Sequence, residues 1–242
     1  MHPSQQKDIY NPSAVKELFN EMSTTYGVVN MIASLGFTII WRKYVIAKLD
    51  RNRAPGVMVD LMSGMGELFS VIRSDLKPPE KLVGIDFSSK MCDQAKVEAG
   101  RNQFETEVIE ADIFDKNIAD GSADTVVCSF GLKTFSQEQQ ARFAKELARI
   151  LKPGGQFSFI EISVPRNSLL RFGLQFYLKL FIPMIGKICL GNPDNYRHLG
   201  VYTGKFGNSR FFHEQVQAAG LESDYFEHFF GCATGVHGRK PN

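Results

Sequence analysis

Short apolar runs alternate with helix-like segments along most of this chain. After the break at Pro55-Gly56, apolar runs cover 57–62, 81–86, 107–112, 123–130 and 156–162, and two further strand candidates lie near 224–230 and 232–237. Helical patterns separate them, beginning after Gly66 and again after Ser88 or Ser89, either of which could cap a helix. This alternation predicts an α/β fold with a mostly parallel sheet covered by helices on both faces. Continuous runs such as 125–128 are typical of strands buried on both sides.

The two ends of this pattern carry additional helices. Residues 13–49 are mainly helical in pattern, with a second helix from about Leu35 to Leu49. A long connection follows the fifth strand, and its most apolar part is Leu169–Leu190, an amphipathic basic stretch with Pro183 as a kink or stop. Such a stretch could be a lid, a membrane-surface helix or a dimer face, and a lid is the usual outcome in a compact domain.

No linker or repeat divides the 242 residues, so we predict one domain. Its parts are an N-terminal helical cap (1–52), a cofactor-binding core (53–165), a lid or substrate insertion (166–212) and C-terminal strands (213–242).

Composition narrows the function classes. Hydrophobic residues make up 43% of the chain, charged residues 22%, and the formal net charge is +2, which argues against a nucleic-acid partner. The four cysteines form no disulfide or zinc spacing, the N-terminus is polar, and charges interrupt the most apolar stretch. We expect a cytoplasmic protein without a metal, with peripheral membrane contact and a homodimer left open.

The candidate chemistry lies where strands end. Asp60 closes the first strand and precedes a loop that contains Ser63, Gly64, Met65 and Gly66. A third glycine at the dinucleotide-binding spacing is missing, and no Gly-Lys-Ser/Thr follows, so neither a nicotinamide fingerprint nor a Walker A loop is present. Glycines at this point let a ligand approach the backbone.

Two further acids follow the next two strands. Asp86 could accept hydrogen bonds from the hydroxyls of a ribose, or it could cap the following helix. Asp112, with the backbone of Ile113, could bind adenine, or it could be a solvated loop acid. Because ligands bind at the carboxyl ends of strands in such sheets, we expect Asp60, Asp86 and Asp112 to converge.

These residues resemble class I S-adenosylmethionine-dependent methyltransferases, which have a Rossmann-like seven-stranded sheet. More specific segments resemble the ubiquinone/menaquinone biosynthesis C-methyltransferase family over nearly the whole chain. They are Phe19 with Tyr26 and Asn30, Ser34-Leu35-Gly36 before Trp41-Arg42-Lys43, Ser129-Phe130-Gly131-Leu132, and the segment 192–199. The resemblance implies S-adenosylmethionine as cofactor and a small-molecule acceptor.

The resemblance also implies residue roles. Asp60 and the glycine loop would lie by the methionine part of the cofactor, Asp86 would hold the ribose with Phe87 and Met91 nearby, and Asp112 with Ile113 would bind adenine. Ser129 and Phe130 would border the sulfonium, and Tyr26 would close over the site. Substrate-binding candidates are Trp41, Thr134, Asn192, Tyr196 and Arg197.

Two catalytic candidates come from the substrate side. The family's Phe-Gly-Leu-Arg-Asn is Phe-Gly-Leu-Lys133-Thr134 here, so Lys133 keeps the charge without the planar fork of arginine. It could stabilise a developing oxyanion or be a surface lysine. His198 is the favoured general base. We therefore expect methylation of a small, largely apolar acceptor such as a quinone-like phenol or a natural-product intermediate. An N- or O-methyltransferase acting on an amine or phospholipid headgroup, and a non-methylating cyclase or sensor, are the alternatives.

Overall fold

The expected α/β fold with a mostly parallel sheet is confirmed. The computed structural model describes residues 9–23, 36–115, 118–182, 184, 187 and 193–242. One seven-stranded sheet has the order β3-β2-β1-β4-β5-β7-β6, and only the β5–β7 and β6–β7 pairs are antiparallel. The strands are β1 (Val57–Leu61), β2 (Lys81–Asp86), β3 (Glu105–Glu110), β4 (Ala123–Ser129), β5 (Leu151–Ile162), β6 (Glu222–His228) and β7 (Ala233–Arg239).

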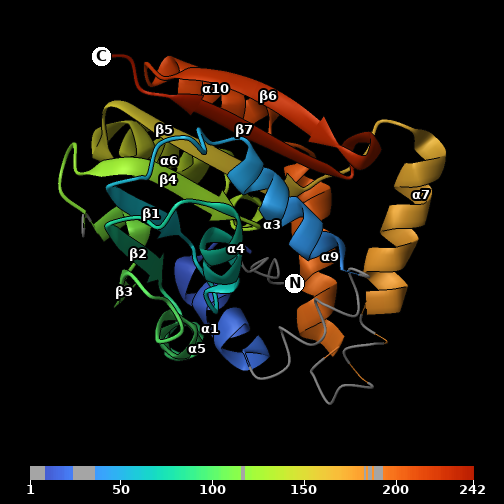
Figure 1. Ribbon diagram of the computed structural model, residues 1–242. Coiled ribbons are helices and arrows are strands. Elements are labelled where there is room, and N and C mark those ends of the chain that lie inside the picture. The colour runs from blue at the N-terminus through green and yellow to red at the C-terminus, as the bar shows by residue number, and fades with distance from the viewer. Residues whose placement is uncertain (1–8, 24–35, 116–117, 183, 185–186, 188–192) are drawn as a thin grey trace.

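Helices cover both faces of this sheet (Figure 1). The α-helices are α1 (Pro12–Met22), α3 (Phe37–Ala47), α4 (Glu67–Asp75), α5 (Ser89–Ala99), α6 (Gln137–Ile150), α7 (Ser168–Phe176), α9 (Pro193–Phe206) and α10 (Arg210–Ala218). A π-helical turn, η3 (Tyr177–Phe181), continues α7, and short 3₁₀ turns are η1 (Ile113–Asp115), η2 (Leu132–Thr134) and η4 (Phe229–Gly231).

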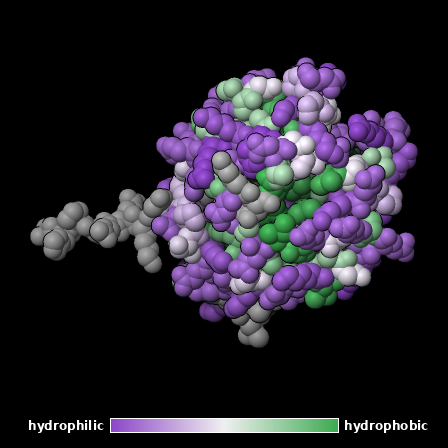
Figure 2. Space-filling view, turned by 90° about the vertical axis from the view of Figure 1, so that its left-hand side faces the viewer, coloured by the Kyte–Doolittle hydropathy of each residue, from purple (hydrophilic) through white to green (hydrophobic). Residues whose placement is uncertain are grey.

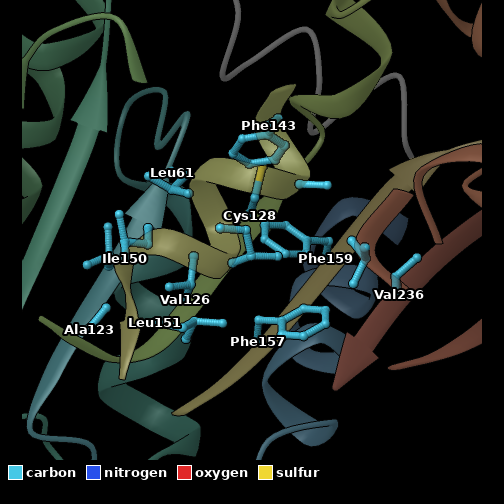
Figure 3. Packing of buried hydrophobic residues seen from close by; sticks show 14 of the residues in the cluster. Leu61, Ala123, Val126, Cys128, Phe143, Ile150, Leu151, Phe157, Phe159 and Val236 are labelled. Carbon is cyan, nitrogen blue, oxygen red and sulfur yellow. The ribbon is translucent and has the colours of Figure 1, made fainter. Parts of the chain in front are cut away.

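The core on the α6 and α10 face is rich in phenylalanine. Alternate residues of β4 and β5 point to this face, so Phe159 packs against Phe143 of α6 with ring centroids 5.7 Å apart (Figure 3). Phe212 of α10 stacks on Phe143 at 5.6 Å. The other face, which packs on α3 and α4, takes the intervening residues such as Met58 and Val127. Burial of both faces explains the continuous apolar runs of these strands.

In the described part of the connection after β3, η1 is the one helical segment. The half-buried Ile113, Phe114 and Ile118 pack against the core there. On the side of the molecule that carries β1, β2 and β3, an apolar area lies among hydrophilic residues (Figure 2).

The predicted insertion before the last two strands divides into two parts. Helix α9 packs inward, where Leu199 and Tyr202 join Val15 and Met22 of α1 in a small core, and the Tyr202 hydroxyl donates to the Ile9 carbonyl over 2.6 Å. Helix α7 lies outside α9 (Figure 1) and has no buried residue. In the first part of the predicted amphipathic stretch Leu169–Leu190, α7 has no buried residue, and the lid role of the stretch stays a prediction. No described helix is long and apolar enough to span a membrane.

Candidate functional site

A cavity lies at the carboxyl ends of β1, β2, β3 and β4. Helix α1, the loop after β1, the start of α5 and the segments after β3 and β4 supply its walls. The lining residues are Tyr10, Pro12, Val15, Phe19, Arg42, Met62, Ser63, Gly64, Glu67, Asp86, Phe87, Met91, Ala111, Asp112, Ile113, Phe114, Ser129, Phe130, Gly131, Thr134, Phe135 and Gln139. Predicted cofactor residues from successive strands therefore meet in one cavity.

The loop after β1 needs its glycines for conformation and for space. Gly64 and Gly66 have φ of 56° and 77°, a region that disfavours side chains. A Cβ on Gly66 would also lie 2.8 Å from the ring of Phe69. The loop is held to the next strand, because Ser63 N–H donates to the Ile85 carbonyl over 2.9 Å. Met65 and Gly66 shape the loop but do not line the cavity.

Asp86 ties this loop to the start of α5. Its Oδ2 accepts from Gly64 N–H and its Oδ1 from Ser88 N–H, each over 2.9 Å. Ser88, not Asp86, caps α5, so the capping alternative for Asp86 is wrong. Burial raises the pKa of Asp86 to about 6, although the backbone N–H groups of Ser88 and Gly64 oppose that shift. A carboxylate held at this cost, facing a cavity, marks a ligand site.

Asp60 lies behind the loop rather than on the cavity wall. It is 1% exposed, and neither carboxylate oxygen has a hydrogen-bond partner among the residues that the structure describes. Burial raises its pKa well above the ordinary value, Glu67 adds to the shift, and the Arg42 charge opposes it. An orphaned acid of this kind is costly unless a ligand or solvent supplies a partner.

Arg42 and Glu67 form an ion pair at the cavity wall. Arg42 Nη2 lies 3.1 Å from Glu67 Oε1, and the guanidinium carbon lies 5.1 Å from the centroid of the Phe130 ring. Arg42 is buried, and its Nε and the hydroxyl of Ser63 also lack partners within the described chain. The Asp60 carboxylate, Arg42 Nε and the Ser63 hydroxyl, none of which has a hydrogen-bond partner within the described chain, thus gather around one end of the glycine loop.

The third acid lies just beyond its strand. β3 ends at Glu110, two residues before Asp112, which is a correction to the predicted strand boundary. Asp112 lines the cavity together with Ile113, and its Oδ1 accepts from Phe114 N–H over 2.9 Å. It is half-buried, not the solvated loop acid of the alternative.

The wall after β4 has a strained residue backed by a buried ion pair. Phe130 has a φ of 67°, unusual for a bulky residue, and lines the cavity beside Ser129 and Thr134. Lys133 points away from the cavity lining: its Nζ lies 2.9 Å from Glu161 Oε1 and donates to the Phe130 carbonyl over 2.6 Å. The surface-lysine alternative is wrong, since Lys133 is 3% exposed.

Several predicted residues lie elsewhere. Trp41 is buried beside Phe130 with ring centroids 6.1 Å apart, and its Nε1 donates to His228 Nδ1 over 3.1 Å. Arg197 and His198 are exposed on α9 and do not line the cavity, and Tyr196 belongs to the same helix. Tyr26 and Asn192 lie outside the described residues.

Other lining residues were not predicted. Val15 and Phe19 have helical spacing that indicates a core face, and only the tertiary packing of α1 places them on the cavity. Arg42 stands next to the predicted Trp41, and Glu67 is the first residue of the helix after the glycine loop. These two positions indicate a role in the cavity only weakly. Nothing in the local sequence distinguishes Tyr10, Phe135 or Gln139.

A sheet of this order, with a glycine loop after β1 and acids at the carboxyl ends of β1 and β2, defines a Rossmann-like methyltransferase. The chain belongs to the ubiE/COQ5 methyltransferase family, whose model matches residues 5–240. It is therefore a methyltransferase dependent on S-adenosylmethionine, as the resemblance implied.

Individual relatives agree with this assignment. The chain is 31% identical over 211 residues to a demethylmenaquinone methyltransferase of Lactobacillus johnsonii, covering 86% of this chain and 85% of the relative. It is 25% identical to the ubiquinone/menaquinone biosynthesis C-methyltransferase UbiE of Desulfotalea psychrophila, covering 92% and 88%. A solved S-adenosylmethionine-dependent methyltransferase of Thermotoga maritima has the same fold, with a TM-score of 0.61 and 16% identity over 93% of this chain and 98% of that one.

Proposed function

We propose that this enzyme methylates a ring carbon of a quinol-type phenol that carries an apolar substituent. The observation that carries the proposal is the lining of the cavity. Acids and the glycine loop gather at the ends of β1 and β2, while α1 and the segments after β3 and β4 contribute mainly apolar and aromatic side chains such as Phe19, Phe114 and Phe135. A cavity with both characters suits a polar cofactor and a flat, apolar acceptor side by side.

The unmatched polar groups fit the cofactor. The amino-acid end of S-adenosylmethionine carries an ammonium and a carboxylate, and the orphaned groups near the loop are the Asp60 carboxylate, Arg42 Nε and the Ser63 hydroxyl. We assign the carboxylate of the cofactor to Arg42. We assign its ammonium to Asp60, which lies behind the glycine loop. Asp86 would hold the ribose, and Asp112 with Ile113 the adenine, as expected from the sequence.

When bound, S-adenosylmethionine supplies a methyl group activated by its sulfonium. The protein's own part is to orient the acceptor and to exclude water. Phe130 and Ser129 line the cavity after β4, and Phe130 has a strained backbone with a φ of 67°. Lys133 acts as a positioning residue for Phe130 through their 2.6 Å hydrogen bond. The role of His198 as a general base stays a prediction.

The charge of the cavity favours a phenol over a phosphorylated acceptor. Among the described lining residues Arg42 is the one cation, and Glu67 already pairs with it. A phospholipid or phosphorylated amine would bring a phosphate with no further cation to receive it. The names of the relatives, which specify demethylmenaquinone and carbon methylation, support the same choice.

The test is methyl transfer from isotopically labelled S-adenosylmethionine to a short-chain demethylnaphthoquinol kept reduced, with Asp86→Ala as the inactive control. We expect one labelled methyl group on a ring carbon, located by product fragmentation. Cofactor binding by calorimetry without any transfer to this acceptor, or a label on oxygen, would reject the proposed acceptor chemistry while leaving the methyltransferase assignment intact.

A further inference from the structure

Helix α7 presents apolar side chains to solvent along its outer face. Leu169 is 78% exposed, Phe172 71% and Phe176 56%, and α7 has no buried residue. Leu180 of the following η3 turn is also 56% exposed. Exposed large apolar side chains scattered singly need no explanation, but a contiguous row of them marks an interaction surface.

The inner side of the same segment is already used. Leu178 is buried, and its Cβ would lie 3.4 Å from a Cβ on Gly200 of α9, so the π-helical turn packs closely on that helix. The outward residues are therefore not the side of the segment that faces the core. They belong to a second face for which the described chain offers no cover.

A second element extends this surface. The turn between β6 and β7 carries Phe229 and Phe230 at φ of 48° and 55°, and Phe230 is 77% exposed. Bulky residues in this backbone region are strained, and their exposure adds a hydrophobic cost. The turn adjoins the start of α7, because a Cβ on Gly231 would lie 3.6 Å from Pro165.

The start of α3 lies beside the turn. Phe37 contacts Phe229 with ring centroids 4.7 Å apart, and the neighbouring Ile39 and Ile40 are 46% and 49% exposed. We call the outward residues of α3, α7, η3 and the β6–β7 turn the apolar rim: Ile39, Ile40, Leu169, Phe172, Phe176, Leu180 and Phe230.

The charges near the apolar rim indicate whether a second copy of the chain or a lipid bilayer would cover it. The sequence has no acidic residue from 163 to 193, whereas Arg166, Arg171, Lys179 and Lys187 fall in that stretch. Glu227 of β6 lies 3.9 Å from Arg166, whose side chain is still 72% exposed. Two copies joined through α7 would bring like charges together, because a two-fold interface apposes the same patch. An anionic bilayer instead complements these cations, and aromatic side chains insert at its interface.

We propose that the apolar rim docks this enzyme on the surface of an anionic lipid bilayer. The side chains of Phe172, Phe176 and Phe230 enter the interface, and the basic residues around α7 contact lipid headgroups. The inference rests on exposure and charge, not on the identity of the acceptor, so it can succeed or fail independently of the proposed quinol chemistry.

The experiment is flotation of the full chain with vesicles of phosphatidylcholine alone and of phosphatidylcholine with phosphatidylglycerol. We expect partitioning onto the anionic vesicles, lowered at least tenfold in Phe172→Ser/Phe230→Ser and lowered by Arg166→Gln. Val97→Ser is the matched control, because Val97 is 63% exposed on α5, outside the apolar rim. Thermal melting and cofactor calorimetry verify that each variant is folded.

Three outcomes would overturn the proposal: no partitioning by the wild type, equal partitioning by the double variant, or equal binding to both vesicle types. Light scattering identifies the competing occupant. A dimer that dissociates in Phe172→Ser/Phe230→Ser but not in Val97→Ser would assign the apolar rim to a second copy of the chain.

Discussion

Lys133 Nζ and Glu161 Oε1 lie 2.9 Å apart inside the protein, where the two side chains are 3% and 0% exposed. The carboxylate is further held by two backbone donors, since Oε2 accepts from Lys133 N–H and Oε1 from Ile162 N–H. The ammonium in turn holds the carbonyl of Phe130, which lines the cavity. The pair therefore links the interior of β5 to the wall of the site.

Removal of one partner should be severe. Lys133→Met leaves the Glu161 carboxylate buried without its counter-charge, and we expect it to lower the free energy of unfolding by about 3–5 kcal/mol. Urea denaturation measures this loss. Lys133→Arg, which keeps the charge, should retain most of the stability and most of kcat. At a temperature where both variants are folded, kcat should therefore be lower in Lys133→Met than in Lys133→Arg. Equal kcat values there would indicate that Lys133 has a purely structural role.

An exposed pair supplies the control for that experiment. Lys16 and Glu110 lie 3.1 Å apart with side chains 42% and 43% exposed. Lys16→Met should change the free energy of unfolding by less than about 1 kcal/mol. Equal losses in Lys16→Met and Lys133→Met would contradict the importance given to the buried pair.

Cofactor affinity should depend on pH through Asp86. Its pKa of about 6 in the free protein means that the carboxylate needed by the ribose is increasingly protonated below that pH. The apparent Kd for S-adenosylmethionine should therefore rise below pH 6, approaching about tenfold per pH unit. Calorimetry from pH 5 to 7.5 tests this, and an unchanged Kd over that range would sink the ribose assignment.

The same pKa shift affects the stability of the free protein in the opposite sense. The folded state holds the Asp86 proton more tightly than the unfolded chain, whose carboxyl keeps the ordinary value of 3.8. The contribution of Asp86 to stability is therefore greatest below about pH 4 and decreases as the pH rises through about 6. Added cofactor should offset this decrease, and melting curves with and without it across this range measure both effects.

Arg42 should determine how the amino-acid end of the cofactor binds. Arg42→Gln removes the charge assigned to the cofactor carboxylate, and we expect the Kd for S-adenosylmethionine to rise at least tenfold. Adenosine, which lacks the amino-acid end, should bind wild type and variant equally. A parallel loss of adenosine binding would mean that the variant has disturbed the cavity instead.

Sequence reasoning predicted the sheet well because buried parallel strands have a distinctive pattern. The run 81–86 matches β2 residue for residue, while the third strand was placed two residues late because Ala111 and Asp112 continue the apolar-to-acid pattern beyond the last ladder pair at Glu110. The exposure of α7 could not be predicted. Its amphipathic period shows that one face is apolar, but not what covers that face.

The site divides in the same way. Asp86 and the glycine loop follow from a local rule about strand ends, and the structure brings them together. The position of Lys133 depends on Glu161, which is 28 residues away, and local spacing contains no information on that partner. His198 was predicted from the residues beside it in the sequence, and of these Arg197 is exposed on α9, as is His198 itself.

His198→Ala tests that choice directly. The side chain is exposed on α9 and does not line the cavity, so the geometry predicts a kcat within about twofold of wild type. A loss of roughly a hundredfold or more, with unchanged melting and cofactor affinity, would instead establish the general-base role and require α9 to move during catalysis. A pH–rate profile distinguishes a catalytic from a non-catalytic His198, because the His198→Ala profile would lose an ionisation only if the histidine is catalytic.

Gly84 provides a final test of how the glycine loop is packed. This residue of β2 faces the ring of Phe69, and a Cβ there would lie 2.6 Å from Cζ of that ring. Phe69 is fully buried, so it cannot move aside, and Gly84→Ala should cost about 1–3 kcal/mol. Because the Ser63 hydroxyl would lie 3.2 Å from the same Cβ, cofactor affinity should fall as well.

Gly204→Ala in α9 is the matched control for Gly84→Ala. Nothing lies within 4 Å of a Cβ at Gly204, and alanine favours a helix, so stability should rise by about 0.5–1 kcal/mol without a change in cofactor affinity. If Gly84→Ala changed neither the stability nor the cofactor affinity, the packing of β2 against α4 would be looser than these distances require.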